Sequence, residues 1–262
     1  MGWLVRARGV VAVKLLVCAK AVASFRAPVR ITSNAASVDP DVLEFGPNEW
    51  DLAAAEEALC LRDQKGGEVV AATCGTSTSE KTLRRLLAMG FNRAVLVEGV
   101  PADPMSVARA LTDVALLEQP DLIFCGARSS DSGHASTGSM LAELLGMPCA
   151  AVVTRVFYDE ERRLAVVERE LEGGLIDHME IDTPAVLTIQ TGISQPRYAN
   201  LRALKKAESL TIDIRRPVRE GPPAYSIRRV FHEQPANHAE MIGGDAAHIA
   251  QRIAEILRTR LS

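Results

Sequence analysis

The sequence lacks several features that would point to a particular class of function. Its five cysteines are scattered and form no CxxC pair, which argues against a disulfide framework or a zinc site and favours a reducing compartment. A net charge of −3 gives no general reason to expect nucleic acid or an anionic membrane as a partner. No apolar run reaches the roughly 18 residues of a membrane-spanning helix, so we expect no membrane insertion. The 47% hydrophobic content is instead typical of a soluble globular protein.

The N-terminus has some features of a secretory signal, namely arginines, an apolar stretch and an ending in small residues. Lys14 and Lys20 interrupt the apolar run, however, and VVAVKLLVCA also fits a buried first strand. We therefore interpret residues 13–20 as a strand and residues 1–12 as a loose extension.

Short apolar runs alternate with helical patterns up to residue 146. Asn48 and Asp103 are plausible helix N-caps, and Pro104 suits a first helical turn. Continuously apolar strands separated by helices indicate a parallel sheet covered on both faces, which is a doubly wound, three-layer α/β fold. Strands are predicted at 13–20, 68–75, 93–99 and 121–127, and helices at 48–64, 79–90, 103–119 and 136–146.

The pattern changes after residue 150. Residues 150–190 contain strand runs with no helix between them, which predicts antiparallel hairpins, with a turn at Gly173-Gly174. Residues 184–190 are predicted as the last parallel strand, and the chain from about residue 194 is predicted to be basic and loop-like. Residues 243–261 predict an amphipathic helix with Ile249, Ile253, Ile256 and Leu257 on one face. We expect one domain over 13–212 and a C-terminal arm over 213–262 that lies on another molecule.

The stretch CGARSSDSGHASTGSM, residues 125–140, places Asp131, His134 and Ser136 close together. A hydrolytic triad draws its members from separate loops, and the G-x-S-x-G elbow is missing, so we do not expect catalysis here. One histidine beside one aspartate also falls short of a metal ligand set.

A phosphate cradle explains this segment better. It follows a strand and opens a helix at Ser136-Thr137-Gly138, where small residues let free N–H groups and the helix dipole face an anion. Ligands of doubly wound sheets collect where strand order reverses, so Cys18-Ala19 at the end of the first strand is expected in the same pocket. The alternative is an ordinary capped helix, since neither the dinucleotide nor the Walker fingerprint is present.

Other polar residues can be explained without a functional role. The isolated histidines are expected on the surface or at helix ends, and they are His178, His232, His238 and His248. The basic run around Lys205 and Lys206 fits a solvated face. Leu201 and Leu204 are interleaved with it, however, which suits protein docking.

Several long motifs, in order over roughly residues 13–215, resemble the β subunit of electron transfer flavoproteins. NEWDLAAAEEAL stands where that family has N-P-F-D/C-x-x-A-V-E-E-A, and LRRLLAMGFNRAVLV is similar to LRTALAMGADRAILV. The other matching segments are VKLLVCAK, QPDLIFCGARSSDSGHASTGSMLAELLGMP, VERELEGGL, TPAVLTI and QPRYANLRALKKA.

The resemblance implies an adenine nucleotide α-hydrolase-like fold and a heterodimer with an α subunit that holds most of a redox-active FAD. It implies an electron carrier without catalytic residues of its own, which binds AMP and passes electrons from flavin dehydrogenases to a quinone reductase. The expected compartment is the cytoplasm in bacteria or the mitochondrial matrix in eukaryotes. The C-terminal arm and helix are expected to pack on the α subunit.

The same resemblance assigns site residues. It places Phe25 and Trp50 near the flavin ring, and a recognition loop at Tyr198 through Ala207 with Leu201 as its anchor. The implied nucleotide-binding residues are Cys18, Asn48, Glu49, Trp50, Asp51, Cys74, Gly126, Arg128, Asp131, His134, Ala135, Ser136, Thr137 and Gly138. The implied docking residues are Arg197, Tyr198, Leu201, Lys205 and Lys206.

The chain departs from the family pattern at this site. The usual D-D-D-x-N-Q-T-G loop is Asp131 to Gly138 here and loses an Asn and a Gln, and Asn-Pro-Phe has become Asn48-Glu49-Trp50. Ala135 and the long C-terminal arm are more similar to bifurcating branches, in which a second FAD replaces AMP. The nucleotide is therefore AMP or a second FAD. A nucleotide-binding protein acting alone is a further alternative, although it would need neither the docking loop nor the arm.

Overall fold

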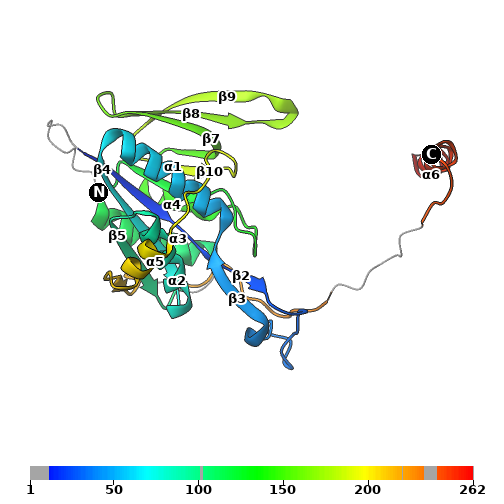
Figure 1. The fold of residues 1–262 in the computed structure, drawn as a ribbon, viewed down its shortest axis with the longest axis horizontal. Coiled ribbons are helices and arrows are strands. Elements are labelled where there is room, and N and C mark those ends of the chain that lie inside the picture. The colour runs from blue at the N-terminus through cyan, green and yellow to red at the C-terminus, as the bar shows by residue number, and fades with distance from the viewer. Residues whose placement is uncertain (1–11, 101–102, 220, 233–240, 262) are drawn as a thin grey trace.

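A nine-stranded sheet forms the middle layer of the protein (Figure 1). The structure, a computed structural model, describes residues 12–100, 103–219, 221–232 and 241–261. The predicted N-terminal extension up to residue 11 and the predicted surface residue His238 lie outside these residues.

The strand order is β11-β5-β4-β1-β6-β10-β7-β8-β9. Neighbours from β11 to β7 are parallel, whereas β7, β8 and β9 form an antiparallel meander. The strands of this sheet are β1 (Val13–Cys18), β4 (Gly67–Gly75), β5 (Arg93–Glu98), β6 (Leu122–Gly126), β7 (Cys149–Asp159), β8 (Leu164–Glu170), β9 (Ile176–Asp182), β10 (Ala185–Ile189) and β11 (Asp213–Arg215).

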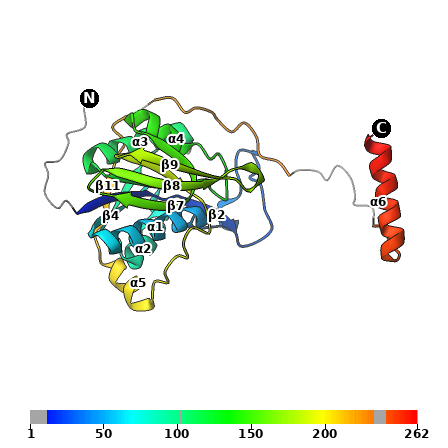
Figure 2. The ribbon, with the colours of Figure 1, turned by 90° about the horizontal axis from the view of Figure 1, so that it is seen from above.

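Helices cover both faces of the sheet, which confirms the predicted three-layer, doubly wound α/β fold with added hairpins (Figure 2). One face carries α1 (Glu49–Lys65) and α2 (Glu80–Met89), with α5 (Leu201–Glu208) packed on α2. The other face carries α3 (Pro104–Glu118) and α4 (Thr137–Leu145). Each face has its own core, because successive side chains of a strand point to opposite sides. In β1, for example, Leu15 packs on the α1 face and Leu16 on the α3 face.

Three elements differ from the prediction. Residues 21–47, where no strand or helix was predicted, contain an antiparallel hairpin of β2 (Ala21–Phe25) and β3 (Leu43–Pro47). The segment expected to be loop-like contains α5, whose Asn200 side chain accepts the N–H of Ala203 at 2.9 Å. The parallel strand predicted at residues 184–190 is confirmed as β10, but it is not the last one, because β11 follows and pairs in parallel with β5. A three-residue edge strand has too few residues for any periodicity to show.

The helix ends agree in part with the prediction. Asp103 caps α3 as predicted, since its carboxylate accepts the N–H groups of Met105 and Ser106.

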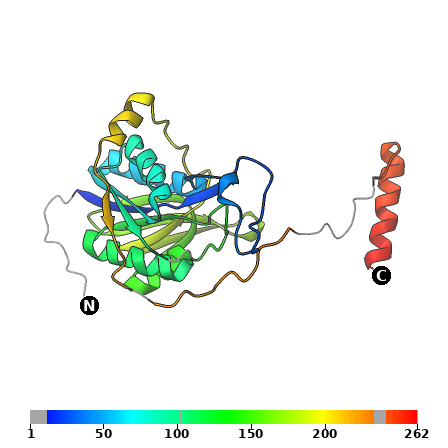
Figure 3. The same ribbon diagram turned by 90° about the horizontal axis from the view of Figure 1, so that it is seen from below.

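The last helix, α6 (Ala246–Leu261), stands apart from the sheet, and none of its described side chains is buried (Figures 1 and 3). Within the described part of the chain, we find no helix with the length and apolar character needed to cross a membrane.

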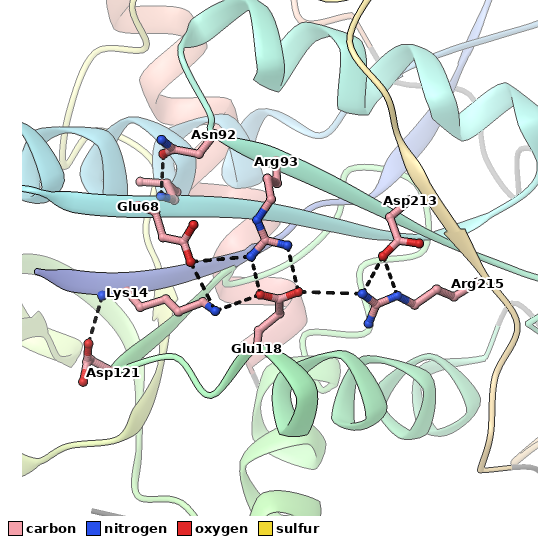
Figure 4. A network of polar contacts seen from close by, with 9 residues as sticks. Lys14, Glu68, Asn92, Arg93, Glu118, Asp121, Asp213 and Arg215 are labelled. Atoms are coloured by element: carbon pink, nitrogen blue, oxygen red, sulfur yellow. Dashed lines mark hydrogen bonds and ion pairs between the residues drawn. The ribbon is translucent and has the colours of Figure 1, made fainter. Parts of the chain in front are cut away.

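A network of charged side chains ties the amino ends of the central strands together (Figure 4). Glu118, at the end of α3, contacts Lys14 of β1 at 2.9 Å and Arg93 of β5 at 2.5 Å. Glu68 of β4 joins Lys14 at 3.2 Å, and Arg215 of β11 lies 3.9 Å from Glu118. The Glu118 side chain is only 6% exposed. Burial raises its pKa, but hydrogen bonds from Arg93 and Lys14 outweigh burial and lower the pKa to about 2.

We expect Glu118→Gln to lower the free energy of unfolding by about 2 kcal/mol at pH 7, because Lys14 and Arg93 lose a shared charged acceptor. Glu118 stabilises the folded state above its ordinary pKa of 4.5, and this stabilisation is lost as pH falls from 4.5 toward 2. The difference between wild type and variant should therefore shrink over that range. Chemical denaturation at several pH values measures it.

Glu160→Gln is the matched control. Glu160, which is exposed, lies 3.8 Å from the half-buried Lys65, and a surface pair of this kind typically contributes about 0.5 kcal/mol. An equal decrease in the free energy of unfolding in Glu118→Gln and Glu160→Gln would show that the Glu118 network stabilises the fold no more than a surface ion pair does.

Candidate functional site

The candidate site lies at the carboxyl ends of β1 and β6. β1 pairs with β4 on one side and with β6 on the other, so the strand order reverses direction there. This is the position at which doubly wound sheets bind ligands. The loop from Ala127 to Ser136, which we call the β6–α4 loop, follows β6 and leads into α4. It meets the end of β1 and the start of α1.

Asp51, in the first turn of α1, joins the two strand ends. One carboxylate oxygen accepts the N–H of Lys20 at 2.7 Å, and the other accepts the N–H of Gly126 at 2.8 Å. Burial raises the pKa of Asp51 to about 6, and these two N–H groups act in the opposite direction. Both oxygens are thus used on the backbone. Asp51 therefore holds the start of α1 against the ends of β1 and β6.

Asn48, which is buried, holds the first half of the β6–α4 loop. Its side-chain amide donates to the carbonyl of Arg128 at 2.8 Å, and its side-chain oxygen accepts the N–H of Ser130 at 3.2 Å. Asn48 occupies the N-cap position of α1, as predicted, but its side chain makes no capping hydrogen bond. The predicted capping role is therefore wrong, because the loop uses the side chain instead.

Lys20 is the residue of this site that the sequence analysis did not find. Its ammonium group donates to Asp131 at 2.6 Å, to Ser132 at 3.0 Å and to Ser129 at 3.3 Å. Burial raises the pKa of Asp131, but the hydrogen bonds from Lys20, Ser129 and Ser132 together with the charge of Lys20 outweigh burial and lower it. The only available signal was that Lys20 lies two positions beyond β1. The structure thus places the ammonium group of Lys20 against residues 129–132 of this loop.

The second half of the β6–α4 loop turns into α4. Gly133 and Ala135 have positive φ angles of 63° and 51°. Ser136 is the N-cap residue of α4, yet its side chain makes no capping hydrogen bond. Across the described residues, no hydrogen bond joins Asp131, His134 and Ser136 to one another. A helix N-terminus approached by small residues suits an anion such as a phosphate.

Two glycines allow close backbone approach around this loop. A Cβ at Gly126 would lie 2.4 Å from an oxygen of Asp51 and 2.7 Å from the Cβ of Trp50. A Cβ at Gly138 would lie 2.5 Å from the γ-methyl of Thr188 in β10. These glycines therefore let α1 and α4 pack tightly against the strand ends.

Three cysteines lie near the carboxyl ends of β4, β1 and β6. Cys18 and Cys125 are opposite each other in register, and a hydrogen bond to Cys125, together with burial, raises the pKa of Cys18 well above its ordinary value. Burial raises the pKa of Cys74 to about 12. Such thiols stay protonated and act as small apolar side chains. No group of side chains suited to a metal ion occurs among the described residues.

The two predicted flavin-facing aromatics come from different elements. Phe25 ends β2 and is exposed, whereas Trp50 is half-buried in the first turn of α1. The guanidinium of Arg128 lies 4.8 Å from the Trp50 ring centroid, a cation–π distance. Glu49 is exposed beside Trp50. Arg128 thus links the β6–α4 loop to the aromatic side chain.

The predicted docking residues separate into two groups. Tyr198 and Leu201 are 82% and 67% exposed, and Lys205 and Lys206 are exposed on α5. Arg197 is instead held against the domain, since its guanidinium contacts the carboxylate of Glu56 in α1 at 2.9 Å.

Helix α2 supports this exposed surface. Arg84 donates to the carbonyl of Ala207 at 2.7 Å and to that of Leu210, at the end of α5. The guanidinium of Arg85 lies 5.8 Å from the Tyr198 ring centroid. A groove of about 560 Å³ between α2 and α5 is lined by Glu80, Lys81, Arg84, Arg85, Leu204 and Glu208.

Most of the chain is similar to proteins of one family. The electron transfer flavoprotein domain matches residues 41–215. The electron transfer flavoprotein subunit beta of Methylophilus methylotrophus is 38% identical, over 93% of this chain and 97% of that protein. The mitochondrial subunit beta of Oryza sativa subsp. japonica is 40% identical, over 76% of this chain and 80% of its own. The human subunit beta is 32% identical, over 78% and 81% respectively.

We expect Gly126→Ala to lower the free energy of unfolding by about 1–3 kcal/mol, because the new methyl group would overlap Asp51 and Trp50. Gly46→Ala is the control, since a Cβ at that strand position has no heavy atom within 4 Å. Urea unfolding of both variants measures the difference. An unchanged Gly126→Ala protein would mean that Asp51 and Trp50 can move away from the strand end without cost.

Proposed function

Because the chain belongs to the electron transfer flavoprotein β subunit family, we propose that it forms a heterodimer with an α subunit and that the pair binds FAD. The heterodimer accepts electrons from flavin dehydrogenases and passes them to a quinone reductase or a similar acceptor. The observation that carries this proposal is the near full-length match to a bacterial β subunit. The relatives occur in bacteria and in mitochondria, so the proposed compartment is the bacterial cytoplasm or the mitochondrial matrix.

The proposed nucleotide is AMP, bound at the β6–α4 loop. The loop fits a nucleotide because small residues approach the start of α4, Lys20 lies within it, and neutral thiols form its apolar floor. In this proposal, Ser136 and Thr137 hold the phosphate, and Cys18 and Cys74 line the pocket. AMP has no redox chemistry, so its proposed role is structural.

The alternative ligand is a second FAD. The Asn and Gln of the family's loop are replaced by Ala135 and Ser136, which removes two amide side chains from the pocket. Ala135 also has a left-handed backbone conformation. The smaller side chains leave more room in the pocket, and this observation favours the bulkier ligand.

The proposed flavin surface of this chain consists of Phe25 and Trp50. FAD, when bound, supplies the electron-accepting and electron-donating chemistry. The aromatic side chains would exclude water from one edge of a bound flavin, and Arg128, held over Trp50, would add positive charge there. We assign no catalytic acid, base or nucleophile to the chain.

The proposed docking surface for dehydrogenases is the exposed side of α5. Leu201 is the apolar anchor, with Tyr198, Lys205 and Lys206 around it, so the partner should present an apolar pocket with acidic residues at its edge. The arm and α6 are proposed to pack on the α subunit, since the isoleucine-rich face of α6 is not buried within this chain. A protein acting alone would leave both surfaces unused.

Co-expression with its α subunit should give a yellow heterodimer that contains one FAD and one AMP. Nucleotides released by denaturation can be quantified by chromatography. Lys20→Met should lower the AMP content without lowering the FAD content, because the β6–α4 loop loses its anchoring cation. Lys81→Met, an exposed lysine of α2, is the control. Two FAD molecules would support the alternative, and a colourless, stable monomer would refute the proposal.

Leu201→Ala should lower kcat/KM for reduction of the heterodimer by a flavin dehydrogenase about 30-fold, which corresponds to about 2 kcal/mol for a buried interface anchor. The matched control is Leu117→Ala. Leu117 is 69% exposed, close to the 67% of Leu201, but it lies on α3 on the other face of the sheet. Equal effects of the two substitutions would argue against docking through α5.

A further inference from the structure

After β11 the chain runs back across the molecule as an extended segment, residues 216–219 and 221–232, which we call the strap. Figures 2 and 3 show it passing along the α3 side of the sheet toward the β2–β3 hairpin. Its residues are almost all exposed. Specific contacts, rather than a buried core, therefore hold the strap.

The first contacts fix the strap along α3. The N–H groups of Val218 and Arg219 both donate to Asp113 at 2.9 Å. Farther along, Arg109 donates to the carbonyl of Pro222 at 3.2 Å. The strap thus runs from the middle of α3 toward its N-terminus, which lies at the same edge of the sheet as the candidate site.

The next contacts bring the strap to the site. Asp103, the N-cap of α3, accepts the N–H of Ala224 at 3.2 Å. The ring of Tyr225 then stacks on His134 of the β6–α4 loop, with ring centroids 5.4 Å apart and planes inclined by 26°. Beyond it, the N–H of Val230 donates to the carbonyl of Ala35 between β2 and β3 at 2.8 Å.

The two halves of the β6–α4 loop are held very differently. Asn48 and Lys20 bind residues 128–132 through five hydrogen bonds. Residues 134 and 135 have no such hydrogen bond or ion pair in the described part of the chain, and the side chain of His134 instead stacks on Tyr225. These residues lead directly into α4, and Ala135 has a positive φ, which is unfavourable for a residue with a Cβ.

We propose that Tyr225 is a positioning residue of the nucleotide site: by stacking on His134, it holds the second half of the β6–α4 loop in the conformation that presents the N-terminus of α4 to the nucleotide phosphate. This inference rests on the nucleotide binding proposed above. Because coupling between two equilibria is reciprocal, a bound nucleotide must also stabilise the docked strap. The strap leads to α6, so occupancy of the site affects the arm that is proposed to contact the α subunit.

The test uses the heterodimer, freed of AMP by mild denaturation and refolding, and titrated with AMP by calorimetry. Tyr225→Ala should raise the Kd about 3- to 10-fold, the usual strength of an aromatic pair. Tyr225→Phe should bind as wild type, because the ring makes the contact. Ile227→Ala, an exposed side chain of the same strap, is the control.

His134→Ala should cause a similar loss, and the double variant should lose no more than either single one. The FAD content of each variant reports on its folding. If Tyr225→Ala does not yield a heterodimer, hydrogen exchange of the wild-type protein with and without AMP provides the test, since AMP should protect residues 221–232.

The possible failures can be told apart. Wild-type heterodimer that binds neither AMP nor a second FAD would refute the proposed nucleotide site, and the role of Tyr225 with it. Wild-type protein that binds AMP, with equal affinity in Tyr225→Ala or with unchanged exchange in the strap, would overturn this inference alone.

Discussion

One carboxylate determines the geometry of the functional edge. Asp51 accepts N–H groups from the ends of two neighbouring parallel strands, and it belongs to the first turn of the helix that covers them. These hydrogen bonds therefore fix the positions of the ends of β1 and β6, the start of α1 and the β6–α4 loop relative to one another. The preceding Asn48 and the neighbouring Trp50 then reach the β6–α4 loop from the same turn. Without the hydrogen bonds to Asp51, the end of β6 would no longer be held against α1, and the first residue of the β6–α4 loop would no longer have a fixed position.

The ionisable groups of the candidate site already have partners within the chain. Its thiols are held protonated by burial and by one another, its aspartates are used on backbone or lysine groups, and its histidine is stacked on a tyrosine. None of these groups is poised for proton transfer or nucleophilic attack. This is consistent with the proposed function, in which a bound flavin would supply the redox chemistry, and it shows that Asp131, His134 and Ser136 can lie close in sequence without being linked to one another.

The sequence was informative where the structure is local. Strands such as Val13–Cys18 and helices such as Pro104–Glu118 follow from apolar runs and caps, and their predicted positions were correct to within about two residues. β11 was missed because its place depends on pairing with β5, where Asp213 lies opposite Val95, and on the contact of Arg215 with Glu118, and these partners are far away in the sequence. At the site, the loop and its neighbours were predicted together, but Lys20 was not, since a lysine 111 positions from Asp131 leaves no local pattern.

The charged network around Glu118 (Figure 4) lies near the amino ends of β1, β4 and β5, whereas the site lies at the carboxyl ends of β1 and β6. This separation has an evolutionary consequence. Substitutions in the β6–α4 loop leave the Glu118 network intact, so the loop can drift in sequence while the chain still folds. If the proposed nucleotide site is correct, a few loop substitutions in the Asp131–Gly138 segment would change which adenine nucleotide binds without disturbing the sheet.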